Sequence, residues 1–491
     1  MKKIIAPFLL LVNLFFHCSF AQTGLYVSQL NNFDTAMIGF MSTHNIPGGQ
    51  LAITHMGKLV YSRGFGLANV AAGDSVYPNS IFRIASLSKP VTAVTIMKLY
   101  QKGLISLDAK VFGTAGILND PPYQNLLDPR DTLITIRMLL QHRGGWNATI
   151  SGDPFFENTY NIATFMGVPS PAPSEIIIKY VLENKMLDFN PGTQAQYSNL
   201  GFSILGKVIE KITGQSYENH VRDTILSPLG INTMQSGFNM LTGQLANEVT
   251  YYDYPAAPYM YSIYDDTTLV PGPYGGFNIE SMDGFGRWVT SAEDIVKLIC
   301  GFDRFNTRPD FLTTATIDTM TKPSPVNPNI ACGFGVDNTN KNWWHYGSLY
   351  GSSSALIRFK NPQVNIAMLF NSSDTIGNIY PSMANILWNV LPTISSWPTF
   401  DLFVGIEDIE NRPDFSIHPN PASSEIFIYT SGKIKEIKIL DLSGKEIVSQ
   451  SYSTPMQNLR IPILSLENGI YFMKVFDGDK SYCKKIIVSH D

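Results

Sequence analysis

The chain has 491 residues, of which 44% are hydrophobic and 15% are charged, and its formal net charge at pH 7 is −5. A chain of this length and composition can bury a large core and forms more than one globular domain. It has no clustered basic face and no long run of one charge, which argues against a nucleic-acid-binding protein and against a polybasic membrane anchor.

The first residues predict a secretory signal peptide. Lys2 and Lys3 precede a mostly apolar run at 4–16, and the small residues Ser19 and Ala21 lie two apart, as a signal peptidase requires. The apolar run is shorter than the ~20 residues that span a bilayer, and no later segment has the length and hydropathy to do so. We therefore expect residues 1–21 to be removed, and the mature chain to be exported through the periplasm and secreted or held at the cell surface.

Cysteine and histidine usage predicts neither a disulfide framework nor a metal centre. After cleavage Cys300, Cys332 and Cys483 remain, an odd number at wide spacing. Cys300 ends an apolar helical stretch and is expected in the core. The eight histidines show no paired or H-E-x-x-H spacing, so neither a metal nor an organic cofactor is expected.

Strand patterns occur at both ends of the first part of the chain. Residues 48–66 predict a hairpin around Met56-Gly57-Lys58, and two further strands are predicted at 353–359 and 364–370, followed by a helix at 376–390. Helical stretches lie between these strand groups. This order predicts one antiparallel sheet built from both ends of a domain, with helices inserted between them.

The stretch R-I-A-S-L-S-K-P-V-T-A, residues 83–93, places a serine and a lysine three apart before an apolar helix. We expect Ser86 to begin this helix and Lys89 to lie on the same face. A buried lysine with a lowered pKa can accept the proton of a nucleophilic hydroxyl. The plainer alternative is an N-cap serine with a solvated lysine.

A second pattern is Tyr197-Ser198-Asn199, which stands just before an amphipathic helix predicted to end at Gly214. The pattern leaves Tyr197 and Asn199 at the mouth of that helix. The alternative interpretation is an asparagine cap beside a packing tyrosine.

A third pattern is W-W-H-Y-G-S-L, residues 343–349, which precedes the late strands. Gly347 is expected to let another backbone, such as that of a substrate, approach closely. The alternative for His345 is a core histidine in a hairpin. The tyrosine-rich segment 251–266 is predicted to lie over the cleft, with a surface loop packed on itself as the equal alternative.

The last part of the chain differs in composition. Residues 396–412 are predicted to be a linker, and residues 413–491 contain short alternating strands separated by Gly and Asp turns, which predict a small all-β sandwich. With H-P-N-P at 418–421 and N-G-I-Y-F-M-K-V at 468–475, this segment resembles a type IX secretion C-terminal sorting domain. The resemblance implies the secretion machinery as a partner. An adhesive or carbohydrate-binding sandwich is the alternative.

The order S-x-x-K, Y-x-N, H-x-G resembles the serine β-lactamase and penicillin-binding superfamily, and is most similar to class C β-lactamases and their esterase and D-aminopeptidase relatives. The resemblance covers about residues 30–391, within a domain expected at 22–395, and includes further likenesses at 139–146, 227–234 and 288–298. It implies an α+β fold, a β-lactamase/transpeptidase-like antiparallel sheet flanked by helices with a helical subdomain.

The same resemblance implies a role for each motif residue. Ser86 is the nucleophile, and Lys89 and Tyr197 share proton transfer. The backbone N–H groups of Ser86 and Ser348 form an oxyanion hole. Asn199 holds a substrate amide and orients Lys89, while His345 and Gly347 line the strand beside the substrate. The G-x-S-x-G motif of the α/β-hydrolases is absent from the chain.

The third motif departs from the usual pattern, because His345 stands where most of the superfamily has lysine. With an ordinary pKa of about 6.5, a histidine is largely neutral at pH 7 and attracts a carboxylate less well. This favours a serine hydrolase acting on an ester, amide or peptide substrate. The alternatives are a D,D-carboxypeptidase or β-lactamase, and a non-catalytic protein that binds peptide or cell wall.

Overall fold

A computed structural model describes residues 21–157, 159–253, 257–373, 379–403, 415–441, 445–476 and 481–490. The chain divides into two compact units, Met1–Phe400 and Asp401–Asp491. Each unit has a hydrophobic core of its own. Residues 1–20 of the predicted signal peptide and residues 404–412 of the predicted linker lie outside the described residues.

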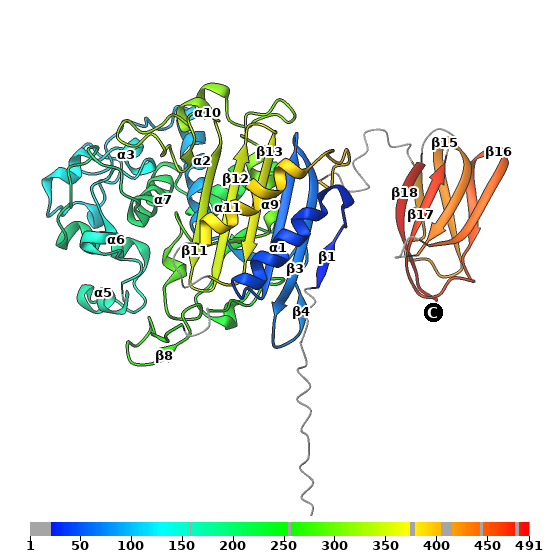
Figure 1. The fold of residues 1–491 in the computed structure, drawn as a ribbon, viewed down its shortest axis with the longest axis horizontal. Coiled ribbons are helices and arrows are strands. Elements are labelled where there is room, and N and C mark those ends of the chain that lie inside the picture. Colours follow the sequence, from blue (N-terminus) through cyan, green and yellow to red (C-terminus); the bar gives the residue numbers. More distant parts are fainter. Residues whose placement is uncertain are drawn as a thin grey trace, which may run out of the picture. The chain divides into compact units, whose positions relative to one another are not determined.

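The first unit is organised around an antiparallel sheet with the strand order β1-β3-β2-β13-β12-β11-β10, in which β4 also pairs with β3 (Figure 1). The strands are β1 (Gln22–Gly24), β2 (Gly48–His55), β3 (Lys58–Asn69), β4 (Asp74–Ser75), β10 (Gly335–Val336), β11 (Trp343–Leu349), β12 (Ser352–Phe359) and β13 (Val364–Phe370). Strand β2 pairs with β13 along its length, which joins the early and the late strands into one sheet. The prediction of one sheet built from both ends of the domain is confirmed.

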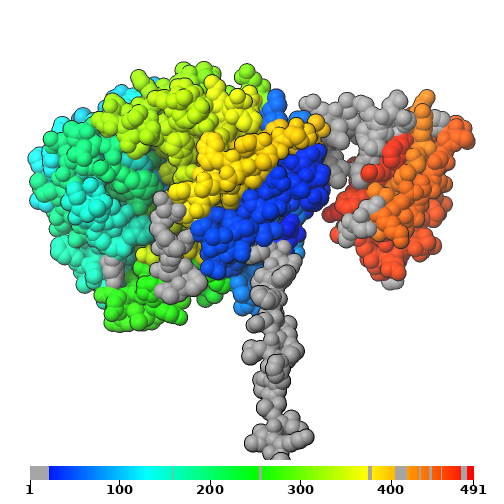
Figure 2. Space-filling model, in the orientation of Figure 1, coloured from blue at the N-terminus to red at the C-terminus, as the bar shows by residue number. Residues whose placement is uncertain are grey.

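Helices cover both faces of this sheet. Helices α1 (Asn31–Thr43) and α11 (Ile379–Val390) lie side by side on one face (Figures 1 and 2) and share a core with alternate residues of β2 and β13. Helix α9 (Ala292–Cys300) packs on the opposite face, where the thiol of Cys300 lies 3.6 Å from the hydroxyl of Thr54. Cys300 and Cys332 are both buried and free, as expected for Cys300.

A largely helical region is inserted between β3 and β10, and it carries two small sheets. Its helices are α2 (Ser88–Gln101), α3 (Ile136–Leu140), α4 (Ala148–Ser151), α5 (Thr159–Met166), α6 (Ser174–Asn184), α7 (Asn199–Thr213), α8 (Tyr217–Val221) and α10 (Thr314–Met320). Its strands are β5 (Phe82–Arg83), β6 (Gln235–Ser236) and β9 (Trp288–Thr290), in the order β5-β9-β6, and the pair β7 (Met260–Tyr261) and β8 (Leu269–Val270). No helix in the described ranges combines the length and the hydropathy needed to cross a bilayer.

Helix α7 follows from its sequence. The side chain of Ser198 accepts a hydrogen bond from the N–H of Gly201 at 3.2 Å and so caps the first turn. The first two turns are buried all round, from Asn199 to Gly206, and in the later part the apolar residues Val208 and Ile209 are buried. The helix ends at Gly214, whose φ of 68° is the left-handed conformation that favours glycine. The predicted end of this helix is therefore confirmed.

The second unit is all-β, as predicted. Its strands are β14 (Phe415–His418), β15 (Glu425–Leu440), β16 (Glu446–Pro462), β17 (Gly469–Phe476) and β18 (Ser481–Val488). Strand β15 pairs with β14, β16 and β17, and a parallel bridge from Ala422 to Val488 also links the segment after β14 to β18. The strands therefore wrap into a nearly closed barrel around an isoleucine-rich core. Short strands were expected in this part of the chain, but residues 425–440 form one long strand, β15, with register irregularities along its pairing with β16.

Candidate active site

Ser86 lies in a tight turn between β5 and α2. The turn is a 3-10 segment, Ala85–Leu87, and α2 begins only at Ser88. Ala85 has a φ of 50°, a conformation that costs a residue with a side chain about 1 kcal/mol or more. The expectation that Ser86 begins and caps the helix is wrong, because no side chain caps either segment and the Ser86 hydroxyl contacts other groups.

Lys89 is the nearest of these groups. Its Nζ lies 3.0 Å from Oγ of Ser86 and 3.4 Å from the backbone oxygen of Phe285. The side chain is completely buried, with Nζ 4.6 Å from the centre of the Tyr197 ring. Burial lowers the pKa of Lys89 well below its usual range, although the charge of Asp153 opposes the shift. The site therefore favours a neutral amine beside the serine hydroxyl.

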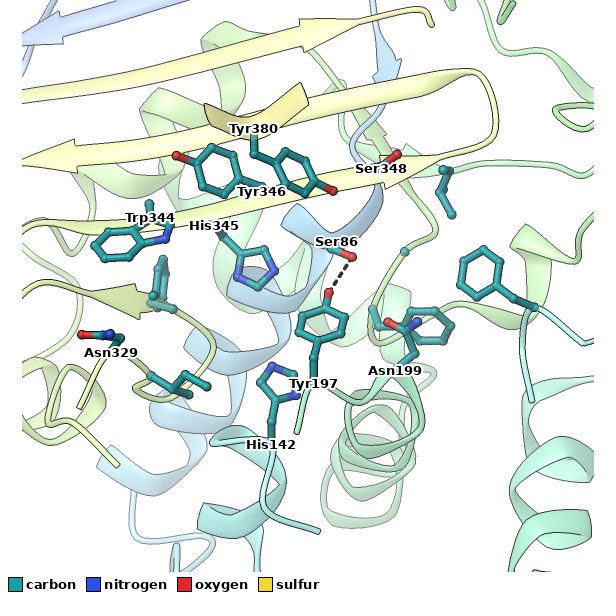
Figure 3. A pocket seen from close by; sticks show the side chains of 17 residues that line it. Ser86, His142, Tyr197, Asn199, Asn329, Trp344, His345, Tyr346, Ser348 and Tyr380 are labelled. Carbon is teal, nitrogen blue, oxygen red and sulfur yellow. Dashed lines mark hydrogen bonds between the residues drawn. The ribbon is translucent and has the colours of Figure 1, made fainter. Parts of the chain in front are cut away.

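Tyr197 approaches the same oxygen from the loop before α7. Its hydroxyl donates a hydrogen bond to Oγ of Ser86 at 2.7 Å (Figure 3). Loss of solvation around the phenol raises the pKa of Tyr197, even though 47% of the residue's surface is accessible through the pocket. Tyr197 is therefore a neutral phenol at pH 7, and of the two predicted proton acceptors Lys89 is the better base.

His142 is a site residue that the sequence analysis did not single out. Its Nδ1 accepts a hydrogen bond from the N–H of Ser198 at 3.1 Å, and its ring centre lies 4.6 Å from that of Tyr197. The imidazole thus supports the loop that presents Tyr197. The only sequence signal was its place in the segment 139–146, because no spacing rule links His142 to a loop so much later in the chain.

Asn199 is the first residue of α7 and lines the same pocket. Its Nδ2 donates to Oδ2 of Asp153 at 2.6 Å. Among the described residues its Oδ1 is buried without a hydrogen-bond partner. The expected contact that orients Lys89 is thus replaced by one with Asp153. Asp153 in turn interacts electrostatically with Lys89, and burial raises its pKa. Sequence reasoning missed Asp153, which lies in an irregular loop with no motif.

Strand β11 forms the wall opposite the helices. It pairs with β12 along its length but with β10 only at Trp343 and Trp344, so its edge is open from His345 onward. Alternation along the strand buries His345 and Gly347 on one side and directs Tyr346 and Ser348 to the other. The ring of Tyr346 stacks on that of Tyr380, and Ser348 and Tyr380 line the same pocket.

Gly347 is needed for a different reason from the one expected. A Cβ at this position would stand 2.4 Å from Oγ of Ser354, 2.6 Å from the backbone oxygen of Ile84 and 2.9 Å from the backbone nitrogen of Ser86. The turn that carries Ser86 therefore fills the space that was expected to receive a substrate backbone. The missing side chain lets the edge strand and this turn meet backbone to backbone.

His345 is buried, and its Nδ1 lies 3.1 Å from the backbone oxygen of Gly333. Burial and the nearby Lys89 lower the pKa of His345 to about 3. The imidazole is therefore neutral at pH 7, in agreement with the expectation from its ordinary pKa.

These side chains surround a pocket of about 490 Å³ (Figure 3). Aromatic rings and neutral polar groups dominate the lining, and the described lining residues contain no arginine or lysine. A second hollow of about 460 Å³ shares Asn329, Trp344 and Tyr346 with the first and continues along β11 toward Trp388. None of the described residues at 251–266 lines the first pocket.

Tyr251, the first residue of the tyrosine-rich segment, packs against Arg83, which lies three residues before Ser86. The hydroxyl of Tyr251 accepts a hydrogen bond from the N–H of Arg83 at 2.7 Å, and its ring lies 4.4 Å from the Arg83 guanidinium carbon. The guanidinium also donates to the backbone oxygens of Pro273 and Phe238, at 2.7 and 2.8 Å. The segment therefore braces the strand that leads into the Ser86 turn. Residues 254–256 lie outside the described ranges.

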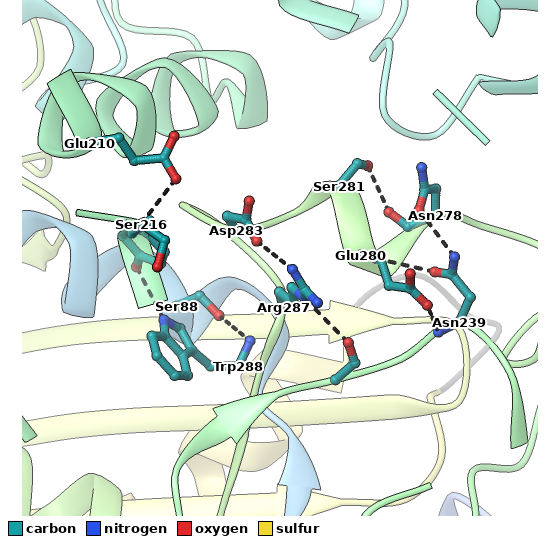
Figure 4. Close-up of polar contacts among 12 residues, drawn as sticks. Ser88, Glu210, Ser216, Asn239, Asn278, Glu280, Ser281, Asp283, Arg287 and Trp288 are labelled. Carbon is teal, nitrogen blue, oxygen red and sulfur yellow. Dashed lines mark hydrogen bonds and ion pairs between the residues drawn. The ribbon is translucent and has the colours of Figure 1, made fainter. Parts of the chain in front are cut away.

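Polar contacts also hold residues 283–288 in place (Figure 4). This segment contains Phe285, whose backbone oxygen lies 3.4 Å from Nζ of Lys89. On either side of Phe285, Arg287 donates to Asp283 at 2.8 Å and the N–H of Trp288 donates to Oγ of Ser88 at 3.4 Å. The indole of Trp288 donates to the hydroxyl of Tyr217 at 3.1 Å. This network fixes the Phe285 carbonyl relative to the start of α2.

Comparison with known proteins agrees with this arrangement. The family model described as Beta-lactamase matches residues 33–378, and the model described as Secretion system C-terminal sorting domain matches residues 416–489. Penicillin-binding protein 4* of Bacillus subtilis is 27% identical over 67% of this chain and 69% of its own length. Esterase EstB of Burkholderia gladioli is 30% identical over 38% of this chain and 45% of its own length.

Among solved structures, the D-amino acid amidase of Ochrobactrum anthropi SV3 in complex with D-phenylalanine has the same fold. Its TM-score is 0.56 at 21% identity, over 74% of this chain and 99% of the amidase. The sorting-domain match indicates export to the cell surface or exterior by the type IX system, and implies an interaction with that machinery. The match over residues 33–378, together with the fold, shows that the chain belongs to the β-lactamase family of serine hydrolases.

Proposed function

We propose that the protein is an exported serine hydrolase that forms an acyl-enzyme on Ser86 and acts on an ester, amide or peptide substrate. One observation carries the proposal. Oγ of Ser86 lies 3.0 Å from Nζ of Lys89 and accepts a hydrogen bond from Tyr197 at 2.7 Å, at the wall of a pocket open to substrate. A hydroxyl held between a neutral amine and a phenol can lose its proton as it attacks.

Acylation begins when Oγ of Ser86 attacks the carbonyl carbon of the substrate and its proton passes to Nζ of Lys89. The negative charge on the carbonyl oxygen is stabilised by the backbone N–H groups of Ser86 and Ser348. The tetrahedral intermediate then collapses, the bond to the leaving group breaks, and the leaving group takes a proton from Lys89 through the hydroxyl of Tyr197. The product of this half-reaction is an ester between Ser86 and the acyl group.

Deacylation repeats these steps with water as the nucleophile. The proton of the water passes through the hydroxyl of Tyr197 to Nζ of Lys89, the same N–H groups hold the oxyanion, and Lys89 gives the proton to Oγ of Ser86 as that oxygen leaves. Asn199 lines the same pocket as Ser86, and we assign it to holding a substrate amide. In both half-reactions the side chains of Ser86, Lys89 and Tyr197 move the protons, and backbone N–H groups stabilise the oxyanion.

The electrostatics of the pocket support a substrate without an essential carboxylate. His345 is neutral, and the described lining holds no permanent cation to attract an anion. The proteins similar to this chain include one named an esterase and one named a D-amino acid amidase, and these names fit an ester or amide substrate. The second candidate is a D,D-carboxypeptidase or β-lactamase, which the penicillin-binding relative and the name of the family model favour.

The test is intact-mass spectrometry of the full mature chain after mixing with a p-nitrophenyl ester or with a penicillin. We expect an acyl adduct from the ester in the wild type, together with release of p-nitrophenol, and neither signal in Ser86→Ala. The matched control Ser28→Ala removes an exposed serine outside the pocket and should behave as the wild type. A lasting Ser86-dependent penicillin adduct, or loss of the penicillin, would move the assignment to the second candidate. If neither compound reacts with Ser86, the result counts against the proposed acyl-enzyme and favours the non-catalytic binder.

A further inference from the structure

Two imidazoles line the pocket near Tyr197 (Figure 3). His142 comes from the segment after α3, and its ring centre lies 4.6 Å from that of Tyr197. His345 comes from β11, with a ring-centre distance of 6.4 Å. Both residues line the pocket that contains Ser86.

The hydrogen bond of His345 fixes its tautomer. Nδ1 lies 3.1 Å from the backbone oxygen of Gly333, and a carbonyl oxygen can only accept. Nδ1 must therefore carry the hydrogen. Because the imidazole is neutral, its second nitrogen, Nε2, carries a lone pair and no hydrogen. Within the described part of the chain Nε2 makes no hydrogen bond, so it is available to a ligand.

His142 has the opposite arrangement. The N–H of Ser198 donates to its Nδ1 at 3.1 Å, so this nitrogen carries the lone pair and Nε2 carries the hydrogen. Burial also lowers the pKa of His142 well below its usual range, which keeps this ring neutral. The pocket therefore presents one imidazole acceptor, on His345, and one imidazole donor, on His142.

An acceptor at His345 has a consequence that a merely neutral residue would not have. A carboxylate oxygen carries only lone pairs, so against Nε2 it would meet another lone pair and gain no hydrogen bond. No arginine or lysine among the described lining residues compensates for this. An amide N–H or a hydroxyl in the same place would pair with Nε2, which otherwise stays without a partner when substrate displaces water.

We propose that His345 is a hydrogen-bond acceptor that selects substrates carrying an uncharged donor, an amide N–H or a hydroxyl, beside the scissile carbonyl and discriminates against carboxylates in that place. This inference rests on the proposed hydrolase activity. It narrows the substrate class to neutral amide-bearing or hydroxyl-bearing esters and peptides.

The test uses thioesters of the form acyl–S–CH₂–X, in which X is a carboxamide, a methyl ester or a carboxylate. The three groups have similar size, and only the carboxamide offers a donor. A second series carries X on the acyl side, so that the group is presented on either side of the scissile bond. Thiol release by the full mature chain gives kcat/KM. In at least one series the carboxamide should exceed the methyl ester by about tenfold, as one hydrogen bond contributes, and the carboxylate should be slowest.

The matched variants are His345→Asn and His142→Asn. An asparagine amide can occupy the place of Nδ1 in each case, donating to Gly333 at 345 or accepting from Ser198 at 142, and both substitutions remove Nε2. His345→Asn should bring the carboxamide and the methyl ester to within about threefold of each other. His142→Asn should change the rates of all three substrates in common and keep the carboxamide preference.

Tautomers are read directly by long-range ¹H–¹⁵N correlation spectra of the full chain labelled at histidine, with the two variants giving the assignments. We expect hydrogen on Nδ1 of His345 and on Nε2 of His142. Hydrogen on Nε2 of His345, a preferred carboxylate, or a carboxamide preference that survives in His345→Asn would each overturn the inference while leaving Ser86-dependent turnover intact. Absence of Ser86-dependent turnover of every thioester would instead overturn the proposed function, and this selectivity with it.

Discussion

Nζ of Lys89 and Oγ of Ser86 lie 3.0 Å apart, and the lysine has no exposed surface. Desolvation favours the neutral amine, and it is this form that can take the proton of the serine. The same contact with a charged ammonium would hold the hydroxyl without activating it. The protonation state of one buried nitrogen therefore decides whether the site is active.

We predict that kcat/KM rises with pH as Lys89 loses its proton and reaches a plateau below the ordinary lysine pKa of about 10.4, because burial lowers the pKa of Lys89. Lys89→Arg should lower kcat/KM by about 10²-fold or more, since arginine stays protonated. Lys98→Arg, farther along α2, is the control and should keep the profile. Activity that falls over this range, or that survives in Lys89→Arg, would contradict the role of base.

Gly347→Ala should damage the site through the backbone. The new methyl group would meet the Ser86 turn and Ser354 at distances of 2.4 to 2.9 Å, so the turn or the strand must move. We expect a loss of about 1–3 kcal/mol in the free energy of unfolding, and a loss of activity larger than the stability change explains. Urea denaturation and ester hydrolysis measure the two effects.

Gly39→Ala is the matched control for this substitution. Gly39 lies in α1, where an added Cβ would meet nothing within 4 Å. Alanine there should stabilise the protein by about 0.5–1 kcal/mol and leave hydrolysis unchanged. Equal behaviour of the two alanine variants would show that position 347 has no special steric requirement.

His345 should make the protein less stable in mild acid. Its pKa is about 3 in the folded protein and about 6.5 in the unfolded chain, so below pH 6.5 the unfolded chain binds a proton that the folded protein does not. Stability is therefore lost as the pH falls from 6.5 toward 3. Between pH 7 and pH 5 the contribution is about 2 kcal/mol.

The measurement is the free energy of unfolding at pH 7 and pH 5 for the wild type and for His345→Asn. Comparing the two proteins separates His345 from Asp131, whose pKa is raised to about 7 by burial and which acts in the opposite direction. Between pH 7 and pH 5, His345→Asn should lose about 2 kcal/mol less of its free energy of unfolding than the wild type loses. Parallel losses in both proteins would show that His345 is accessible to protons in the folded state.

Arg83→Met should unfold the protein more easily and slow hydrolysis. Arg83 lies three residues before Ser86. Its guanidinium donates to two backbone oxygens and packs on the ring of Tyr251. Its loss leaves buried acceptors unpaired, and we expect a cost of about 3 kcal/mol. Arg137→Met removes a partly exposed ion pair with Asp108 and should cost less than about 1 kcal/mol. Similar midpoints in guanidinium chloride for both variants would argue against a bracing role for Arg83.

A chain that ends at Phe400 should keep the kcat/KM of the full protein, because the hydrolase unit has its own core and its own pocket. In the native host the same truncation should leave the enzyme inside the cell envelope, which fractionation and activity assays of the medium would show. Normal release without the tail would mean that residues 401–491 do something other than sorting.

Periodicity predicted the elements of this fold well. The hairpin at 48–66, the late strands and α7 all follow from local patterns of period two or 3.6, which the structure confirms. The position of Ser86 did not follow, because S-x-x-K has the same spacing whether the serine begins an α-helix or precedes it in a tighter turn. The φ of 50° at Ala85 could not be predicted either, because alanine rarely adopts a positive φ.

The motifs predicted that Ser86, Lys89, Tyr197, Asn199 and the strand at 343–349 would lie together. They did not predict the residues that hold these side chains in place. His142 and Asp153 act through contacts between loops far apart in sequence, and such contacts leave no period or spacing to detect. The pattern also marked Gly347 without saying which backbone would fill its space. Only the assembled sheet shows that this backbone is that of the nucleophile.

The hydroxyl of Ser354 donates to the backbone oxygen of Ile84 at 2.8 Å across 270 residues of sequence. The turn that contains Ala85 and Ser86 is thus held by β12, a strand that is synthesised much later than the turn. A chain that is still being synthesised, or is partly unfolded, has Ser86 and Lys89 in one helix-forming segment. It lacks the hydrogen bond from Ser354 to Ile84. The geometry of the Ser86 turn therefore depends on completion of the sheet, because β12 supplies the hydroxyl that holds the Ile84 carbonyl.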